Sequence, residues 1–144
     1  MKNYSAFIQQ KTTISIPTGI ENADNLQYNG KMFAFQRDIV CWALKRGRAC
    51  IWSGCGTGKT IMELEWAKHV SEFTEKPVLI FAPLAVSEQT ANEEAPKFGY
   101  DCRIVSSQKD IKSGINITNY EKMEKFDLGP AVLVEQHQPR RELQ

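Results

Sequence analysis

The residues most suited to chemistry form a glycine-rich run at residues 53–60, which reads Ser-Gly-Cys-Gly-Thr-Gly-Lys-Thr. Glycines allow a tight turn in which successive backbone N–H groups point at one oxyanion. A helix that begins at Lys59 adds its positive N-terminal end to such a site. Lys59 then reaches the outer phosphates of a nucleotide, and the Thr60 hydroxyl binds Mg²⁺. The run therefore predicts a phosphate-binding loop, whose cradle also includes Gly54, Gly56, Thr57 and Gly58.

Ser53 stands where the common form of this loop, Gly-x-x-x-x-Gly-Lys-Ser/Thr, has its first glycine. Serine is also small, so the departure is mild. The alternative interpretation is a glycine-rich turn that only caps a helix. A strand predicted before the loop and a helix predicted after it favour phosphate binding.

The elements that must position this loop alternate between strands and helices. Apolar residues at helical spacing predict helices over residues 33–46, 59–70, 86–95 and 120–125, and short apolar runs predict strands over 49–52, 78–82, 102–105, 115–118 and 131–134. Pro96 is expected to end the helix over 86–95. This alternation is typical of βαβ units, so we expect an α/β fold in which helices cover both faces of a parallel sheet.

Composition narrows the class of protein. The 144 residues fit one domain, and the net charge of +1, from 18 basic and 17 acidic residues, gives no charge-based reason to expect nucleic acid. The four cysteines form no Cys-x-x-Cys pair and the two histidines lie far apart, which argues against zinc. No apolar stretch is long enough to span a bilayer, and the first residues lack a signal-peptide pattern, so we expect a cytoplasmic protein without a membrane partner.

Residues 32–38, upstream of the loop, read Met-Phe-Ala-Phe-Gln-Arg-Asp. The amide of Gln36 can donate and accept hydrogen bonds together, which suits the edge of an adenine ring. A neighbouring aromatic ring can stack on the base. The alternative is an ordinary first turn of a helix with an exposed glutamine.

Two later segments join a strand to a polar turn. Residues 78–86 run from an apolar strand through Pro83 to a helix start, whose backbone N–H groups can bind a nucleic-acid phosphate. Residues 115–121 read Ile-Asn-Ile-Thr-Asn-Tyr-Glu, whose polar and aromatic side chains suit contacts to a nucleic-acid strand. For this second segment, a helix start with Thr118 or Asn119 as N-cap is an equal alternative.

Taken with the phosphate loop, these segments resemble the first RecA-like lobe of a superfamily 2 helicase, close to phage-type DEAD/DEAH and chromatin-remodeller-type ATPases. The resemblance implies a P-loop NTPase fold that binds ATP and Mg²⁺, acts on DNA, and works in the cytoplasm of a bacterium or a phage-infected host. It assigns adenine selection to Gln36, and nucleic-acid contacts to Pro83, Gln89, Thr118, Asn119 and Tyr120. It spans residues 31–135, which leaves residues 1–30 as an N-terminal arm and residues 136–144 as a tail outside the family.

The chain departs from that family at residues 131–135, Ala-Val-Leu-Val-Glu, where the family pattern ends in Asp-Glu. Glu135 keeps the place of the catalytic glutamate, which orients the attacking water. Val134 replaces the aspartate and offers no oxygen to Mg²⁺. The later helicase motifs and the second lobe are also missing, so we expect a truncated lobe, with a sheet incomplete at its C-terminal end and negligible hydrolysis. The tail is explained either by a frameshift in a longer gene or by a naturally short protein.

Three functions compete at this point. The first is the ATP-binding lobe of a helicase or translocase, and the sequence distinguishes neither these two motors nor DNA from RNA. The second is a small P-loop nucleotide kinase, which explains the short length but neither Gln36 nor the turn at Pro83. The third is a non-catalytic nucleotide-binding or DNA-binding module, or an inert truncated product, which Val134 favours.

Overall fold

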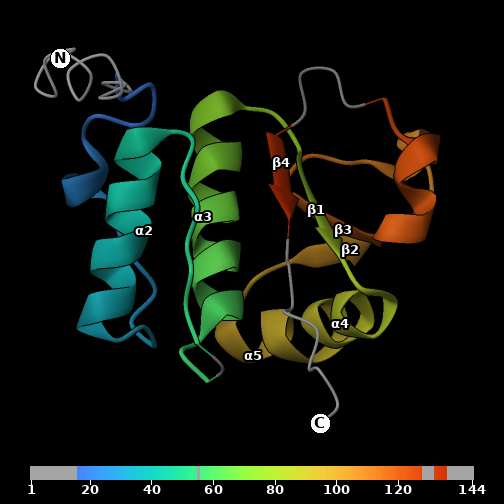
Figure 1. Cartoon of the computed structure of the whole chain (residues 1–144), viewed down its shortest axis with the longest axis horizontal. Coiled ribbons are helices and arrows are strands. Elements are labelled where there is room, and N and C mark those ends of the chain that lie inside the picture. Colours follow the sequence, from blue (N-terminus) through green and yellow to red (C-terminus); the bar gives the residue numbers. More distant parts are fainter. Residues whose placement is uncertain (1–15, 55, 128–131, 136–144) are drawn as a thin grey trace, which may run out of the picture.

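The computed structural model describes residues 16–54, 56–127 and 132–135 (Figure 1). The α-helices are α2 (Ala34–Arg46), α3 (Lys59–Thr74), α4 (Leu84–Gln89) and α5 (Ala95–Phe98), and a π-helical turn, η2 (Thr90–Glu94), joins the last two. The strands are β1 (Val78–Ala82), β2 (Cys102–Ile104), β3 (Ile115–Asn119) and β4 (Val132–Glu135). Short 3-10 helices are η1 (Ala23–Asn25), η3 (Gln108–Asp110) and η4 (Tyr120–Lys125).

The described strands form one parallel sheet in the order β2-β3-β1-β4. Within it, Val78 of β1 lies opposite Ile115 of β3 on one side and Val132 of β4 on the other. All five residues of β1 are apolar and buried, the pattern of a strand that is covered on both faces. The α/β fold with a parallel sheet, predicted from the sequence, is confirmed.

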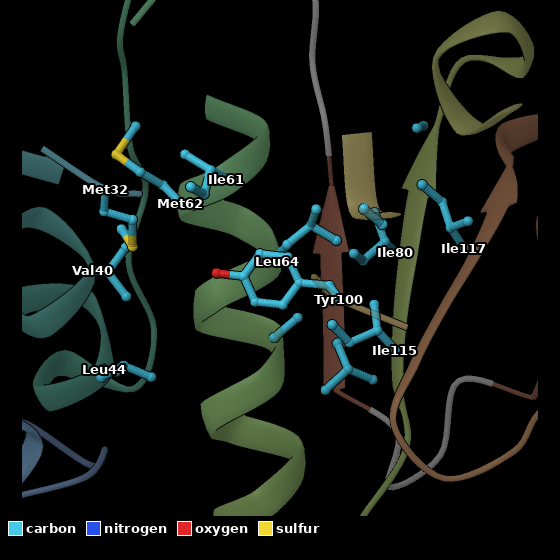
Figure 2. Close-up of a cluster of buried hydrophobic side chains, with 14 of the residues drawn as sticks. Met32, Val40, Leu44, Ile61, Met62, Leu64, Ile80, Tyr100, Ile115 and Ile117 are labelled. Carbon is cyan, nitrogen blue, oxygen red and sulfur yellow. The ribbon is translucent and has the colours of Figure 1, made fainter. Parts of the chain in front are cut away.

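Helix α3 lies between the sheet and α2, and its apolar side chains serve both (Figure 2). Leu64 lies on the sheet side of α3, near Ile80, whereas Met62 lies on the side of α2, near Met32. The main hydrophobic cluster also includes Val40, Leu44, Ile61, Ala91, Ala95, Tyr100, Ile115 and Ile117. One continuous core therefore holds the start of α3 at a fixed place relative to the sheet.

The opposite face of the sheet is covered by a smaller cluster. Leu79 and Phe81, which alternate with Val78 and Ile80 along β1, pack there with Val105 and Phe126. Side chains from η4 add to this cover. In the part of the chain that the structure describes, no helix is long and apolar enough to cross a membrane.

Part of the segment expected to be an N-terminal arm belongs to this core. The backbone N–H of Ile20 donates to the carbonyl of Leu44 at 2.8 Å, and the N–H groups of the two preceding residues donate to the next carbonyls of α2. These bonds satisfy carbonyls that a helix end leaves without partners. Ile20 and Ala23 are buried in the main cluster. Residues 16–26 therefore close the end of α2, while residues 1–15 lie outside the described part.

Residues 49–52 were predicted to form a buried strand, and this prediction is wrong. The described sheet does not include them, and the side chains of Ile51 and Trp52 are 36% and 85% exposed. A strand needs a neighbour for its backbone hydrogen bonds, and no strand pairs with this segment among the described residues. The apolar composition indicates which residues suit a strand, but it does not supply the partner.

Pro96 does not end the helix that precedes it, contrary to the prediction. It is the second residue of α5, so the helical course runs through it. The wide π-helical turn immediately before it lets the helical course continue past the ring. Gly99 ends α5 instead, in the left-handed conformation (φ 83°), and its N–H donates to the carbonyl of Pro96.

Candidate nucleotide-binding site

The glycine-rich loop lies at the N-terminus of α3, at the same edge of the sheet where β1 runs into α4 (Figure 1). In open α/β sheets, ligands bind at this edge, outside the carboxyl ends of the strands. Gly56 and Gly58 adopt left-handed conformations with φ of 76° and 77°, which glycine permits at little cost. Gly58 is the N-cap of α3, so the free N–H groups of the first helical turn open toward the loop. Cys55 lies outside the described residues.

Lys59 and Thr57 fold back on the loop. The Lys59 ammonium donates to the carbonyl oxygens of Ser53 and Gly54 at 3.1 and 3.2 Å, and the Thr57 hydroxyl donates to that of Gly54 at 2.9 Å. The Ser53 hydroxyl is buried and has no hydrogen-bond partner in the described structure. A loop with an exposed ammonium, free N–H groups and an unpaired hydroxyl fits a polyphosphate. Thr60, half-buried in the first turn of α3, can offer its hydroxyl to Mg²⁺.

Gln36 connects α2 to this loop. Its side chain is only 4% exposed, so the alternative of an exposed glutamine does not hold. Its Oε1 accepts from the backbone N–H of Phe33 at 2.9 Å, and its Nε2 donates to the carbonyl oxygen of Thr57 at 2.9 Å. An amide nitrogen has a second hydrogen and an amide oxygen a second lone pair, so each atom keeps capacity for one more bond. Selection of adenine by Gln36 stays a prediction.

A hollow of about 410 Å³ opens beside Gln36 and the loop. It is lined by Lys31, Phe33, Phe35, Gln36, Gly56, Thr57, Gly58, Ile61 and Phe98. The rings of Phe33 and Phe35 are nearly parallel, with centroids 6.1 Å apart, and are 69% and 49% exposed. Exposed aromatic faces beside a polar amide suit a planar heterocyclic base. Sequence reasoning missed Lys31, Ile61 and Phe98, and no motif signalled Phe98, which comes from α5.

Of the residues expected to contact nucleic acid, all but Gln89 lie at the carboxyl ends of β1 and β3. Pro83, the N-cap of α4, is half-buried, and Gln89, the last residue of α4, is exposed. Thr118 and Asn119 are 1% and 6% exposed, and Thr118 Oγ1 and Asn119 Oδ1 have no hydrogen-bond partner among the described residues. The structure thus brings Gln89 to the surface, whereas it buries Thr118 and Asn119. Their contact with nucleic acid stays a prediction.

Tyr120 follows these two residues and is half-buried. Its ring stacks on Phe81, with centroids 6.5 Å apart and an angle of 20° between the planes. Asn119 is the N-cap of η4, as the helix-start interpretation holds, but its side chain makes no capping hydrogen bond. Tyr120 therefore contributes to the smaller hydrophobic cluster at this edge.

The last predicted site residue, Glu135, is placed by its position in the sheet. In register, Val134 lies opposite Ile80 and Glu135 lies opposite Phe81. Because the strands are parallel, Glu135 stands at the carboxyl edge, the edge at which α3 begins (Figure 1). This is the edge that an acidic residue must occupy to act on a phosphate held by the loop.

Comparison with known proteins agrees with this geometry. Residues 9–143 match the family described as "Type III restriction enzyme, res subunit", a superfamily 2 helicase-type ATP-binding domain. No curated protein and no solved structure matches the chain. The matched residues extend on both sides of the span 31–135 and include the loop, Gln36 and the whole described sheet. The chain therefore belongs to the type III restriction enzyme res subunit family and carries its helicase-like ATP-binding module.

Proposed function

We propose that this chain is the ATP-binding lobe of a DNA-dependent ATPase, of the helicase or translocase type, which binds ATP with Mg²⁺ but hydrolyses it poorly. The observation that carries the proposal is the hydrogen bond from Gln36 Nε2 to the carbonyl oxygen of Thr57. This bond places the amide expected to read adenine directly against the loop expected to hold the phosphates. One ligand that has both a base and a polyphosphate fits the two sides together.

Each side of the site has its own role in this proposal. Lys59 turns from the loop carbonyls to the outer phosphates, and Thr60 holds Mg²⁺. The base lies in the hollow beside Gln36, against an exposed phenylalanine ring such as Phe33. Glu135, at the carboxyl edge of the sheet, orients water toward the last phosphate.

Poor hydrolysis follows from the residue before that glutamate. Enzymes of this kind use an aspartate there to hold Mg²⁺ through its waters. Val134 has only a hydrocarbon side chain, so Mg²⁺ loses this ligand and the charge on the last phosphate is less well neutralised. The same observation favours a second candidate function, a non-catalytic nucleotide-binding module.

The nucleic-acid surface is proposed at the carboxyl ends of β1 and β3. Gln89 is exposed at the end of α4, the helix that begins at the Pro83 turn, and backbone N–H groups can bind phosphates without reading sequence. Thr118, Asn119 and Tyr120 join this surface if the end of β3 opens to admit a strand. DNA in the cytoplasm of a bacterium or a phage-infected host is the partner that the family resemblance favours.

The first experiment titrates the full chain with ATP and Mg²⁺ by isothermal titration calorimetry. Lys59→Ala should weaken ATP binding by at least about tenfold, because it removes a charge-assisted contact to the phosphates. Lys109→Ala, which removes an exposed lysine on η3 away from the loop, is the matched control and should bind as the wild type does. ATP binding that is the same with and without Lys59 would contradict the proposal.

A second measurement separates the two candidate functions. The motor lobe predicts slow, Mg²⁺-dependent release of phosphate from ATP that rises when single-stranded DNA is added. A non-catalytic module predicts ATP binding of ordinary strength with no phosphate release at any DNA concentration. Val134→Asp should raise the rate of release only in the first case, because only then do Lys59, Thr60 and Glu135 act together on ATP and Mg²⁺.

A further inference from the structure

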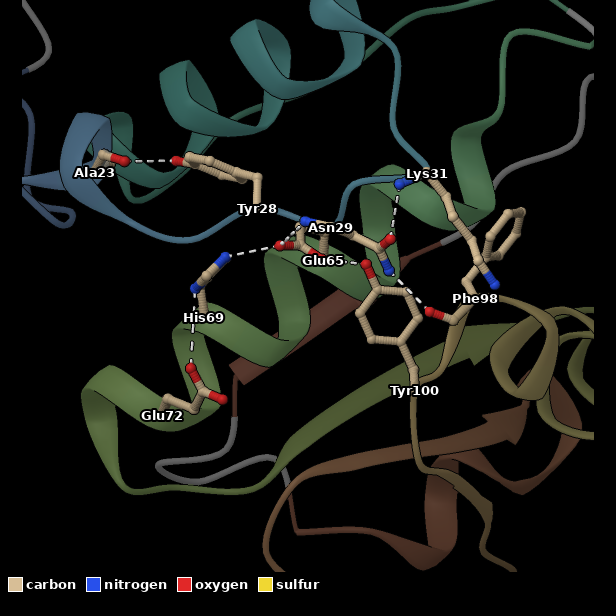
Figure 3. Close-up of polar contacts among 9 residues, drawn as sticks. All are labelled: Ala23, Tyr28, Asn29, Lys31, Glu65, His69, Glu72, Phe98 and Tyr100. Atoms are coloured by element: carbon tan, nitrogen blue, oxygen red, sulfur yellow. Dashed lines mark hydrogen bonds and ion pairs between the residues drawn. The ribbon is translucent and has the colours of Figure 1, made fainter.

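A buried carboxylate lies on α3, further along the helix than the phosphate loop. Glu65, on α3, is 0% exposed. Burial of a charged group is costly unless hydrogen bonds replace its water. Glu65 receives them from the Tyr100 hydroxyl, from His69 Nε2 at 2.9 Å and from the backbone N–H of Asn29 at 3.1 Å (Figure 3).

These hydrogen bonds decide the charge of Glu65. Burial acts to raise the pKa of its carboxyl group, but the hydrogen bonds from His69 and Tyr100, with the nearby charges of His69 and Lys68, outweigh it and lower the pKa below its ordinary value. Burial raises the pKa of Tyr100, and the hydrogen bond to Glu65 raises it further, so the phenol stays protonated and donates. Glu65 is therefore a charged acceptor at neutral pH, with its donors fixed around it.

Asn29 links Glu65 to the segment that leads into the base side of the site. Its side-chain Nδ2 donates to the carbonyl oxygen of Phe98 at 2.8 Å, and its Oδ1 accepts from the backbone N–H of Lys31 at 3.0 Å (Figure 3). Lys31 Nζ in turn donates to the carbonyl oxygen of Lys97 at 2.5 Å. The turn at residues 29–32 is thus held by α3 on one side and by the end of α5 on the other.

That turn leads directly into the base side of the nucleotide site. Lys31 and Phe98 both line the hollow. Phe33 follows the turn, and its backbone N–H donates a hydrogen bond to Gln36 Oε1. The phosphate side of the site begins with Lys59, at the start of the same helix that carries Glu65. One rigid helix therefore holds the phosphate loop at its end and, through Glu65, the base-binding segment along its side.

We propose that Glu65, with Tyr100 as its donor, is a positioning residue that sets the base side of the site against the phosphate side. This inference rests on the proposed ATP-binding function and deepens it. Glu65 lines neither the hollow nor the loop, so it acts through Asn29 and the turn that follows. Its loss therefore lowers the part of the affinity that depends on the base and spares the part that depends on phosphate.

The test compares two ligands, ATP and inorganic tripolyphosphate, each with Mg²⁺, by calorimetry on the full chain. Tyr100→Phe keeps the ring in the core and removes only the hydroxyl that donates to Glu65. We expect ATP affinity to fall about five- to tenfold, since the bond removed is to a charged acceptor, and tripolyphosphate affinity to stay within about twofold. Glu65→Gln, which keeps the shape of the side chain, should show the same split.

Tyr28→Phe is the matched control. The Tyr28 hydroxyl donates to the carbonyl oxygen of Ala23 at 2.7 Å, and its ring packs edge-on against His69. This change therefore removes one half-buried phenol bond from the same region without removing a donor of Glu65. It should leave both affinities unchanged. Circular dichroism and urea unfolding of each variant report whether the fold survives, and Tyr100→Phe decides the question if Glu65→Gln does not fold.

The possible outcomes are distinct. Loss of ATP affinity with tripolyphosphate affinity kept supports the positioning role. Equal weakening of both ligands overturns it, because a purely structural role affects the whole site. Unchanged ATP affinity in Tyr100→Phe and Glu65→Gln overturns it as well. A wild-type chain that binds neither ligand contradicts the proposed ATP-binding function itself, and the inference falls with it.

Discussion

Gln36 and Gly58 approach so closely that a Cβ atom at residue 58 would lie 2.2 Å from Nε2 of Gln36. Gly58 also has a φ of 77°, so two independent features require glycine there. Its hydrogen atoms let the Gln36 amide reach the carbonyl oxygen of the preceding Thr57. The packing of α2 against the phosphate loop thus requires that residue 58 have no side chain.

Gly58→Ala should destabilise the fold by about 2–3 kcal/mol, of which about 1–2 kcal/mol is left-handed backbone strain and about 1 kcal/mol is the displaced hydrogen bond of Gln36. Gly56→Ala is the matched control, because Gly56 has a φ of 76° but no atom within 4 Å of its Cβ position. It should therefore cost only the strain. Urea unfolding of both variants measures the difference. Equal losses would show that the contact with Gln36 contributes nothing.

Gly19→Ala tests the bonds that join residues 18–20 to the end of α2. A Cβ at residue 19 would lie 1.8 Å from the carbonyl oxygen of Leu44, a backbone atom that cannot move aside. The expected loss is about 3 kcal/mol or more, measured by urea unfolding. Gly30→Ala meets no atom within 4 Å and should change stability by less than about 0.5 kcal/mol. A similar small effect at both residues would mean that the N-terminal segment does not dock on α2.

The charge of Glu65 predicts how stability responds to acid. Since the pKa of Glu65 is lower in the folded chain than its ordinary value of 4.5, its ionised form stabilises the fold above about pH 4.5. That contribution is lost as pH falls through the lower, folded-state pKa. The stability gap between wild type and Glu65→Gln, from urea unfolding at pH 7 to 3, should narrow with acid. A gap that is constant with pH would contradict an ionised Glu65.

Cys102 should resist alkylation. Burial, with the charges of Glu63 and Asp101, raises the pKa of its thiol to about 12. At pH 8 the reactive thiolate is then only about one part in ten thousand. Cys50 is exposed and is the internal control. A time course with iodoacetamide, read by peptide mass spectrometry, should label Cys50 well before Cys102, and simultaneous labelling would show that Cys102 is accessible and ionised.

The sequence predicted those parts of the fold that depend on local pattern. The apolar run of β1 has the predicted bounds, and α3 begins at Lys59, because a glycine loop and helical spacing mark that point. The strand predicted at residues 49–52 did not form, since a strand also depends on a neighbour that a local pattern does not show.

The same distinction between local pattern and distant partners applies to the residues of the site. Lys59, Thr60 and Gln36 were predicted from contiguous motifs, and the structure brings the loop and Gln36 together. The contacts around Glu65 were missed, because their members come from distant parts of the chain and belong to no motif. Only the fold shows that Asn29 and Tyr100 share one carboxylate.

The strand order has a consequence for synthesis on the ribosome. Val78 of β1 pairs with Ile115 and Val132, both far downstream, and none of its sheet partners precedes it in the chain. The nascent apolar segment at residues 78–82 must therefore wait, with its backbone groups unpaired, until β3 has left the exit tunnel. Contacts between residues far apart in the sequence form slowly, and the apolar surface that they will bury stays exposed to aggregation until then. During translation, this segment is therefore exposed to aggregation until its partner strands emerge.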